Sequence, residues 1–449
     1  SRQIAWGIPI PAFQNVDDSD DWIYDERVDQ EVIEVDGKTY HRDPDVFDTW
    51  FSSGSWPYAT LDFPDSDDFK RFYPLSLMET GGEILYPWVS RMIMLGLYVT
   101  GDIPFREVYI HGYVMAEDGS KMSKSVGNVI APMPVIEKYG SDALRMGIIS
   151  GRTAAVNRGY DVRRVEEARN FCNKLWNVAR YIEGVIGDQP DRTEVKPVTI
   201  ADHWILDKIR TTQEKICREL DAYGFSEAYE TLYHFVWDDL ADWYVEASKT
   251  EPNKPLLAYL LEQVLVLAHP FAPFVTETIW QTLAWEQDSL LAARQITDVI
   301  SSDNGAAADF TELQNIVTEA RYIVRALKVA NATLYYTEAP FLADNATTIA
   351  RLAGLQAVTQ VRDGSGLYLT STKQNCWLDI DAATARAYLK ELEGKQTRQT
   401  EVIQQLEGRL ANKAYVKQAP KAVVEQTKQQ LKEARELLES LGNEVNRFS

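Results

Sequence analysis

The segment from Glu117 to Val129, "EDGSKMSKSVGNV", gathers lysines, serines and glycines in a chain whose net charge is −21. Ammonium groups on long flexible stems suit a polyphosphate, whose negative charge must be neutralised as it leaves a reacting centre. Lys121 and Lys124 lie three residues apart, and the flanking Gly119 and Gly127 permit close approach of the backbone to a ligand. The pattern indicates a phosphate-binding loop, although a bare Lys-x-Ser-Lys sequence is more often a solvated surface loop.

The elements that precede this loop would position it. The stretch "YPWVSRMIMLGLYVTG" has apolar residues on all sides and predicts a buried helix that ends at Gly101. The following "REVYIHGYV" predicts a buried strand with a turn at Gly112. Helix, strand and glycine loop in this order are typical of an α/β layer. Further upstream, Val-Ile-Val alternation in residues 17–37 predicts a hairpin strand with solvated acidic side chains.

From about residue 133 the pattern becomes helical. The stretch "PVIEKYG" ends on a C-capping Gly140, and Ser141 is expected to be the N-cap of the next helix. A long helix over 163–186 carries an apolar face made of Phe171, Leu175 and Val178. Residues 202–300 hold further amphipathic helices, broken by "TEPNKP" and "HPFAPF", which predicts an all-helical bundle. The "GAAADF" stretch at 305–310 is expected to be a linker.

The last third changes twice. Residues 311–380 alternate helices with short strands, which predicts a small α/β subdomain. Two heptad-spaced runs follow, separated by "NKAYVKQAPKA", and predict an antiparallel coiled-coil hairpin. Residues 386–449 carry 12 Lys and Arg against 9 Asp and Glu, a net charge of +3 that leaves −24 on the rest. Polar Gln396 and Gln399 weaken the seam, which favours a projecting arm over an oligomer core, and a dimerising hairpin is the alternative.

Length, composition and charge argue against several classes of protein. A length of 449 residues suits two to four domains, and the net charge argues against a general nucleic-acid binder. Apolar runs fall short of the roughly 18–20 residues of a membrane span, so we expect a cytoplasmic protein without membrane contact. Three distant cysteines, Cys172, Cys217 and Cys376, predict buried thiols in a reducing compartment, and five scattered histidines indicate no protein-bound metal. The opening "SRQIAWGIPIPAF" does not have the pattern of a signal peptide and is typical of the middle of a domain. We therefore expect the chain to be part of a longer protein.

The loop and its surroundings resemble one family. "KMSKS" is the second signature of class I aminoacyl-tRNA synthetases, and the chain is similar to that family over essentially its whole length. The stretches that resemble its valine-specific members are "DVFDTWFSSGSWP", "PWVSRMIMLGL", "YIHGYV", "SKMSKSVGNVI", "RNFCNKLWNVARY", "HPFAPFVTETIW" and "NKAYVKQAPKAVVEQTK". The family's first signature, a HIGH-like tetrapeptide, does not occur in the sequence, and we expect its half of the fold and the editing domain to lie outside the chain.

The resemblance implies a multidomain fold with half of a Rossmann-like catalytic domain. The implied parts are the distal catalytic half with the KMSKS loop (1–130), a stem-contact helical segment (131–200), an anticodon-binding helix bundle (201–305), a small α/β subdomain (311–381) and a coiled-coil tRNA-binding arm (383–449). The implied reaction is attack of the valine carboxylate on the α-phosphate of ATP, followed by transfer of valine to tRNA(Val). ATP would enter with Mg²⁺ as a substrate.

The resemblance also assigns roles to individual residues. Lys121 and Lys124 would hold the departing β- and γ-phosphates. The implied ATP contacts are Gly81, Glu83, His111, Gly112, Met122, Ser123 and Ser125. Trp50, Ile84 and Trp88 would wall the valine side chain, with Ile84 and Trp88 spaced i, i+4 on one helix face; plain core packing is the alternative. Glu83 stands where the family usually has Asp as a ribose-hydroxyl acceptor, and the extra methylene moves the carboxylate by roughly 1 Å or more.

Three readings stay open from the sequence. The chain could act as a monomer with an N-terminal synthetase half supplied in trans. It could be a catalytically inactive tRNA-binding module, or it could belong to an isoleucine-specific enzyme. We expect the 449-residue chain alone to bind tRNA and to show negligible valine-dependent exchange of pyrophosphate into ATP.

Overall fold

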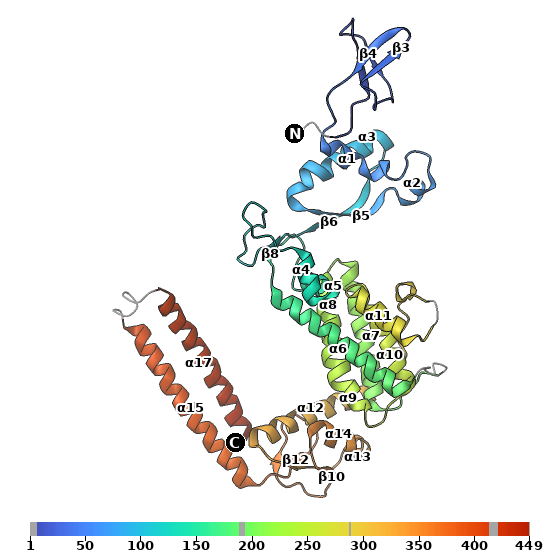
Figure 1. Cartoon of the computed structure of the whole chain (residues 1–449). Coiled ribbons are helices and arrows are strands. Elements are labelled where there is room, and N and C mark those ends of the chain that lie inside the picture. The colour runs from blue at the N-terminus through green and yellow to red at the C-terminus, as the bar shows by residue number, and fades with distance from the viewer. Residues whose placement is uncertain (1–6, 188–193, 287–288, 413–420, 449) are drawn as a thin grey trace. The chain divides into compact units, whose positions relative to one another are not determined.

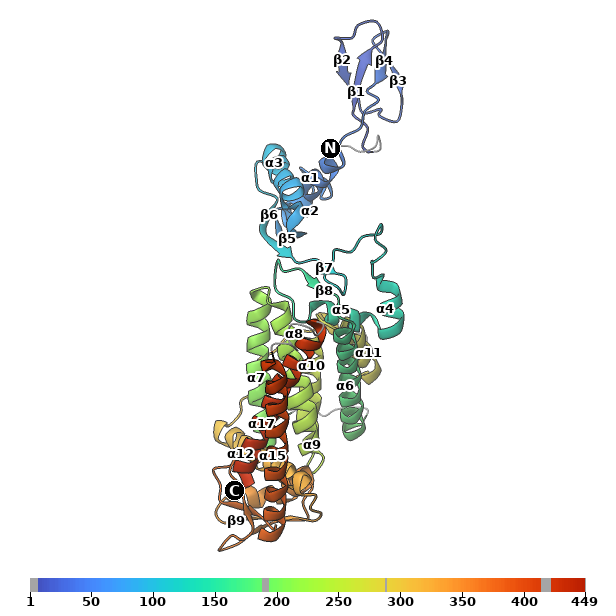
Figure 2. The same cartoon turned by 90° about the vertical axis from the view of Figure 1, so that its left-hand side faces the viewer.

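The computed structural model describes residues 7–187, 194–286, 289–412 and 421–448 (Figures 1 and 2). The chain forms two compact units, which are described separately. The first comprises Ser1–Arg169 with Ala222–Glu227, and the second comprises Asn170–Asp221 with Ala228–Ser449. Within the described ranges, no helix is both long and apolar enough to cross a membrane.

The first unit begins with a four-stranded antiparallel sheet in the order β2-β1-β4-β3. Its strands are β1 (Ala12–Asn15), β2 (Trp22–Tyr24), β3 (Val32–Val35) and β4 (Lys38–Arg42). Asp36 and Gly37 both have positive φ, as a two-residue hairpin turn requires, so the predicted hairpin strand is confirmed. Phe13, Ile33 and Tyr40 form its small core.

An α/β layer follows the sheet. Its elements are α1 (Thr49–Ala59), α2 (Asp67–Phe72), β5 (Leu75–Gly81), a 3₁₀ turn η1 (Gly82–Ile84), a π-helical turn η2 (Leu85–Val89), α3 (Ser90–Thr100) and β6 (Phe105–His111). The strands β5 and β6 pair in parallel. Met78, Val89, Met92 and Phe105 make the core between strands and helix, and Gly101 caps α3 with φ 81° as predicted.

The predicted burial of this helix and strand is wrong. Tyr86 and Tyr98 are 84% and 89% exposed, and Phe105 is the one buried residue of β6. The reason is that β5 and β6 form a sheet of only two strands, which leaves much of their surroundings uncovered. The predicted single helix is also interrupted, because the π-helical turn precedes the regular helix.

The first unit ends with short elements around the KMSKS loop: β7 (Val114–Met115), α4 (Pro132–Tyr139), α5 (Ser141–Ile149), β8 (Arg158–Gly159) and the start of α6 (Val162–Ile186). Gly140 has φ 92° and ends α4 as predicted. The predicted N-cap at Ser141 is wrong by one residue, because Gly140 occupies the N-cap and no side chain caps the helix.

The second unit contains the predicted helix bundle. After α6 come α7 (Ile200–Asp221), α8 (Phe225–His234), the π-helix η3 (Phe235–Tyr244), α9 (Val245–Ser248), α10 (Lys254–Ala268), α11 (Pro273–Leu283) and the 3₁₀ turn η4 (Leu291–Ala293). The breaks between α9 and α10 and between α10 and α11 fall at the two predicted Pro-containing segments. Phe171, Leu175 and Val178 are buried, which confirms the predicted face.

The small α/β subdomain begins with α12 (Asn304–Leu327). The "GAAADF" stretch lies inside this helix, so the predicted linker is wrong; the Asp303 side chain accepts a 2.8 Å bond from Ala306 N and starts the helix there. The remaining elements are β9 (Thr333–Tyr336), α13 (Pro340–Asp344), α14 (Ala346–Ala353), β10 (Ala357–Gln360), β11 (Leu367–Tyr368) and β12 (Cys376–Leu378). The sheet order is β10-β9-β12-β11. Cys376 is buried, whereas Cys172 and Cys217 are half-buried, so the prediction of buried thiols holds for one of three.

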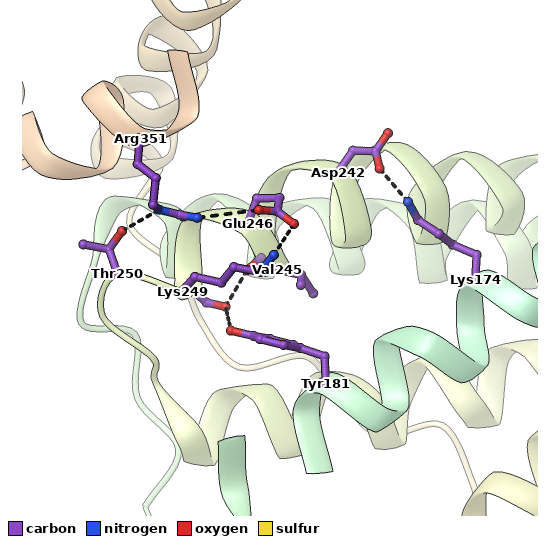
Figure 3. A network of polar contacts seen from close by, with 9 residues as sticks. Lys174, Tyr181, Asp242, Val245, Glu246, Lys249, Thr250 and Arg351 are labelled. Atoms are coloured by element: carbon purple, nitrogen blue, oxygen red, sulfur yellow. Dashed lines mark hydrogen bonds and ion pairs between the residues drawn. The ribbon is translucent and has the colours of Figure 1, made fainter. Parts of the chain in front are cut away.

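A polar network joins this subdomain to the bundle (Figure 3). Arg351 of α14 contacts Glu246 of α9 at 3.6 Å and donates to Thr250 Oγ1 at 3.2 Å. Glu246 also pairs with Lys249, whose ammonium lies 5.7 Å from the Tyr181 ring centroid. Because these contacts link α6, α9 and α14, bundle and subdomain are tied by charge as well as by packing.

The chain ends in two long helices, α15 (Ala382–Ala411) and α17 (Lys421–Phe448), which pack side by side (Figure 1). Ile403, Leu406 and Ala434 lie buried between them, as the heptads predict. The Gln399 side chain donates to Ala434 O at 3.1 Å, so this polar seam position is satisfied across the pair. Most of the predicted connecting turn lies outside the described residues.

Candidate functional site

The candidate site lies at the carboxyl ends of the two parallel strands of the first unit. Gly81 and His111 are direct partners in the β5–β6 register, so the chain leaves the sheet at two adjacent points. Ligands of open α/β sheets bind at this edge. Glu83 follows on η1, two residues beyond the end of β5. The topology therefore brings together three of the residues singled out in the sequence.

The KMSKS loop is organised by turns and by one asparagine. Ala116 N donates to Ser120 O at 2.8 Å and closes the turn that contains Gly119, where φ is 81°. Asn128 Oδ1 accepts from Ser123 N at 2.8 Å, and its amide nitrogen donates to Ser120 Oγ at 3.0 Å. Asn128 thus joins both ends of the loop, which holds the two lysines on a defined backbone.

The two lysines differ in their surroundings. Lys121 Nζ lies 2.6 Å from Glu83 Oε2 and 5.3 Å from the centroid of the Tyr113 ring. The hydrogen bond to Glu83, together with the charge of that carboxylate, raises the pKa of Lys121, so the ammonium is fully charged at neutral pH. Lys124 is exposed at the next turn and forms no ion pair with any described carboxylate. One lysine is therefore held at the strand edge, and the other is open to an incoming anion.

Met122, Ser123 and Ser125 lie between and beside these lysines. Ser123 Oγ and Ser125 Oγ are 2.6 Å apart, and Ser123 O accepts from Val126 N and Gly127 N at 3.2 and 3.1 Å. Both serines therefore shape the turn that presents Lys124.

His111 is held by contacts on both ring nitrogens. Nδ1 lies 3.2 Å from Gly112 O, and Nε2 lies 3.3 Å from Glu79 Oε1. The ring also meets the Tyr113 ring edge-on, with centroids 5.7 Å apart. Its orientation at the strand end is thus defined before any ligand binds.

Gly112 has a structural role that the sequence did not reveal. A Cβ atom placed on Gly112 would overlap the carbonyl group of Val156 and lie 3.0 Å from Asn157 N. The segment that carries Val156 is fastened to the strand by two hydrogen bonds, Ala155 N to Ile110 O at 2.9 Å and Tyr113 N to Asn157 Oδ1 at 2.8 Å. Glycine is needed at position 112 because another backbone segment packs on it.

The three residues expected to wall a valine side chain do not share one pocket. Trp50 lines a cavity of about 640 Å³ with Phe51, Arg91 and apolar residues of α3. Trp88 lines a second cavity of about 510 Å³, and its Nε1 donates to Ser53 O at 3.3 Å. Ile84 lines neither of these two cavities. It ends the 3₁₀ turn while Trp88 lies in the π-helical turn, so they are not on one regular helix. The valine pocket stays a prediction.

Sequence reasoning missed several residues at this site. Glu79, Tyr113 and Asn128 contact the predicted residues directly, yet none has a spacing that marks it. The turn-forming Gly-Asn pair after the lysines was the one available signal for Asn128. The described residues hold no group of three or more His, Cys, Asp or Glu side chains that could bind a metal ion.

Comparison with known proteins assigns three parts of the chain to family models. Residues 1–158 match the family model of class I tRNA synthetases for isoleucine, leucine, methionine and valine. Residues 202–336 match the anticodon-binding domain of tRNA ligases, and residues 379–448 match the tRNA binding arm of valyl-tRNA synthetases. The first match places the strand edge and the KMSKS loop in the class I tRNA synthetases. The last match narrows the family from four amino-acid specificities to the valyl-tRNA synthetases.

Individual relatives agree with the models. The valine--tRNA ligase of Bacillus cereus is 41% identical over 340 residues, which is 72% of this chain and 38% of that protein. The valine--tRNA ligase of Geobacillus stearothermophilus is 40% identical over 341 residues, with the same coverage. The chain therefore belongs to the valyl-tRNA synthetase family, and it spans 38% of the length of these curated relatives.

The fold has a solved counterpart. The LeuRS of Agrobacterium radiobacter K84, solved in a ternary complex with tRNA and LeuAMS, superimposes with a TM-score of 0.56 at 18% identity. The match covers 74% of this chain and 44% of that one. At this identity the likeness shows a shared class I fold.

Proposed function

We propose that this chain supplies the KMSKS half of an adenylate-forming site for valine, together with surfaces that bind tRNA(Val). The observation that carries the proposal is the placement of Lys121, Glu83, His111 and Gly81 at one strand edge. The relatives named valine--tRNA ligase support the choice of valine and tRNA(Val).

The roles follow from the chemistry of the groups. Valine's carboxylate oxygen attacks the α-phosphorus of ATP, and the bond to the β,γ-pyrophosphate breaks. Charge then accumulates on the departing group, and Lys121 and Lys124 neutralise it. His111 and the strand edge position the nucleoside. Transfer of the valyl group to the 3′-terminal ribose of tRNA(Val) completes the reaction, and Mg²⁺ enters with ATP as part of the substrate.

The ion pair between Lys121 and Glu83 adds a step. In this structure Glu83, the expected acceptor for the ribose hydroxyl, is paired with Lys121, one of the two expected phosphate ligands. ATP binding therefore requires Lys121 to leave Glu83, so that the carboxylate accepts from the ribose and the ammonium turns to the phosphates. Both side chains are more than half exposed, so water replaces their contacts during the exchange.

The remaining catalytic residues would come from a segment equivalent to the part of the relatives that the chain does not match. The test is exchange of labelled pyrophosphate into ATP, with valine present. We expect negligible exchange by the 449-residue chain, and restored exchange when the preceding half of a valyl enzyme is added in trans. Robust exchange by the chain alone would refute the split site. No exchange in either case, with tRNA(Val) still bound, would identify an inactive tRNA-binding module.

A further inference from the structure

Three arginines converge behind the strand edge of the first unit: Arg152, Arg158 and Arg164, here called the arginine cluster. The Nη1 atom of Arg164 donates to Ser150 Oγ at 2.9 Å. A Cβ atom placed on Gly151 would lie 2.5 Å from Arg158 Nη1 and would overlap Arg164 Nη1, so two guanidinium groups meet over one glycine. The third arginine donates from Nε to Ile148 O, one turn away at the end of α5.

The arginine cluster lacks the counter-charges that several other described arginines of this chain have, such as Arg27, Arg163 and Arg435. Within the described ranges, none of the three guanidinium groups forms an ion pair. The adjacent Arg163 illustrates the contrast, since its Nη2 lies 3.0 Å from Asp161 Oδ2. Carboxylates are abundant in a chain of net charge −21, so composition does not explain their absence here.

Arg152 carries the clearest sign of an incomplete site. Its Nη1 atom is buried and has no hydrogen-bond partner in the protein. Burial lowers its pKa, and the positive charges of Arg158 and Arg164 lower it further. Unpaired buried donors and crowded like charges are costly, and a bound anion would relieve both.

The backbone around the arginine cluster is fixed to the candidate site. Arg158 N donates to Tyr113 O at 3.1 Å, and Tyr160 N donates to Met115 O at 2.9 Å, so β8 pairs with β7. The strand β7 lies in the sequence between His111 and the KMSKS loop, and β8 is its pairing partner. A ligand on the arginine cluster would therefore lie on the same framework as the candidate nucleotide site.

A purely structural explanation covers part of this arrangement. Cations near a helix C-terminus are stabilising; Arg152 donates to Ile148 O near the end of α5, and Arg164 donates to the side chain of its C-cap residue Ser150. Stabilisation of a helix C-terminus requires one cation rather than three. It also gives no role to Arg158 or to the buried Nη1 atom of Arg152. Guanidinium groups that share one face present several N–H donors in the planar geometry that phosphate oxygens accept.

We propose that the arginine cluster binds a phosphate group of an RNA backbone. The assignment to RNA rests on the proposed function, whereas the phosphate site itself rests on the geometry of the three guanidinium groups. Phosphate contacts position a nucleic acid without reading its sequence. The arginine cluster would thus help to hold tRNA against the first unit, independently of the anticodon.

The test compares Arg158→Gln and Arg164→Gln with Arg163→Gln in the full 449-residue chain. Arg163→Gln is the matched control, because it removes the same charge from a neighbouring arginine, in the same helix turn as Arg164, that is paired with Asp161. Binding of a fluorescent tRNA(Val) transcript is followed by anisotropy from 50 to 200 mM NaCl. We expect each cluster variant to bind about tenfold more weakly, with a salt slope lower by about one, and the control to bind like wild type.

A second arm uses inorganic phosphate, added at constant ionic strength while the unfolding temperature is measured. Wild type and Arg163→Gln should gain stability from phosphate, and the cluster variants should gain none. Loss of this gain with unchanged RNA affinity would overturn the RNA assignment in favour of a free anion. Cluster variants with the same tRNA affinity and the same phosphate-induced stability gain as Arg163→Gln would refute the proposed phosphate site. Because neither arm measures valine activation, a failure of the proposed function in pyrophosphate exchange is a separate result.

Discussion

Replacing Gly112 by alanine should dislodge the segment that packs on the candidate site. The added methyl would overlap the Val156 carbonyl, and that group belongs to backbone rather than to a flexible side chain. To make room, residues 155–158 must retreat by roughly 1 Å, which stretches the hydrogen bonds from Ala155 N, Tyr113 N and Arg158 N beyond 3.5 Å. Three weakened bonds at about 1 kcal/mol each give a loss of about 2–3 kcal/mol.

Thermal unfolding followed by circular dichroism measures this loss. For a unit of this size it corresponds to a fall of roughly 5–10 °C in the unfolding temperature of the first unit. Gly82→Ala is the matched control, because its added Cβ would lie at an ordinary 3.6 Å from Ile110 Cγ2. Equal unfolding temperatures for the two variants would refute the packing role assigned to Gly112.

Other consequences of the structure can be measured independently. Hydrogen bonds from Asn15, Lys38 and Tyr40 lower the pKa of Asp21 to about 2. The ionised carboxylate therefore stabilises the first sheet at pH values above its unfolded pKa, and this stability should be lost as the pH falls from about 4 toward 2. NMR titration of Asp21 checks the pKa, and a value near 4 would contradict the prediction. Burial raises the pKa of the Cys376 thiol to about 12, so Cys376 should react far more slowly with thiol reagents than half-buried Cys217 until the chain unfolds; equal native rates would speak against the buried site. Leu175→Ala removes a fully buried side chain from the bundle and should cost about 2–5 kcal/mol in denaturant unfolding, whereas Leu437→Ala on the exposed side of the arm should cost well under 1 kcal/mol; similar costs would mean that the bundle core is misassigned.

Much of the architecture could be predicted from local pattern. Heptad spacing predicted the two arm helices, and the Asp36-Gly37 turn fits the predicted hairpin strand. Helix and strand order in the small subdomain also agrees with prediction, because capping glycines such as Gly354 mark the ends of its elements.

The errors arise where tertiary context decides. The stretch from 86 to 101 is apolar on all sides, yet Tyr98 is exposed, because the two-stranded sheet of this unit covers little of it. The "GAAADF" stretch looked like a linker, but Asp303 caps a helix that runs through it. At the candidate site, the KMSKS motif identified the two lysines. The motif does not specify the contact of Lys121 with Glu83, which lies 38 residues away, or the contacts of Asn128 with loop residues 5 and 8 positions away.

The central claim is that the KMSKS loop serves an adenylate-forming site specific for valine. The direct measurement is pyrophosphate exchange by the chain with the preceding half of a valyl enzyme, using wild type and Lys124→Ala, with valine or isoleucine. We predict exchange with valine, little with isoleucine, and a loss of about a hundredfold or more on Lys124→Ala. Exchange with isoleucine but not valine, or full activity of Lys124→Ala, would contradict the claim.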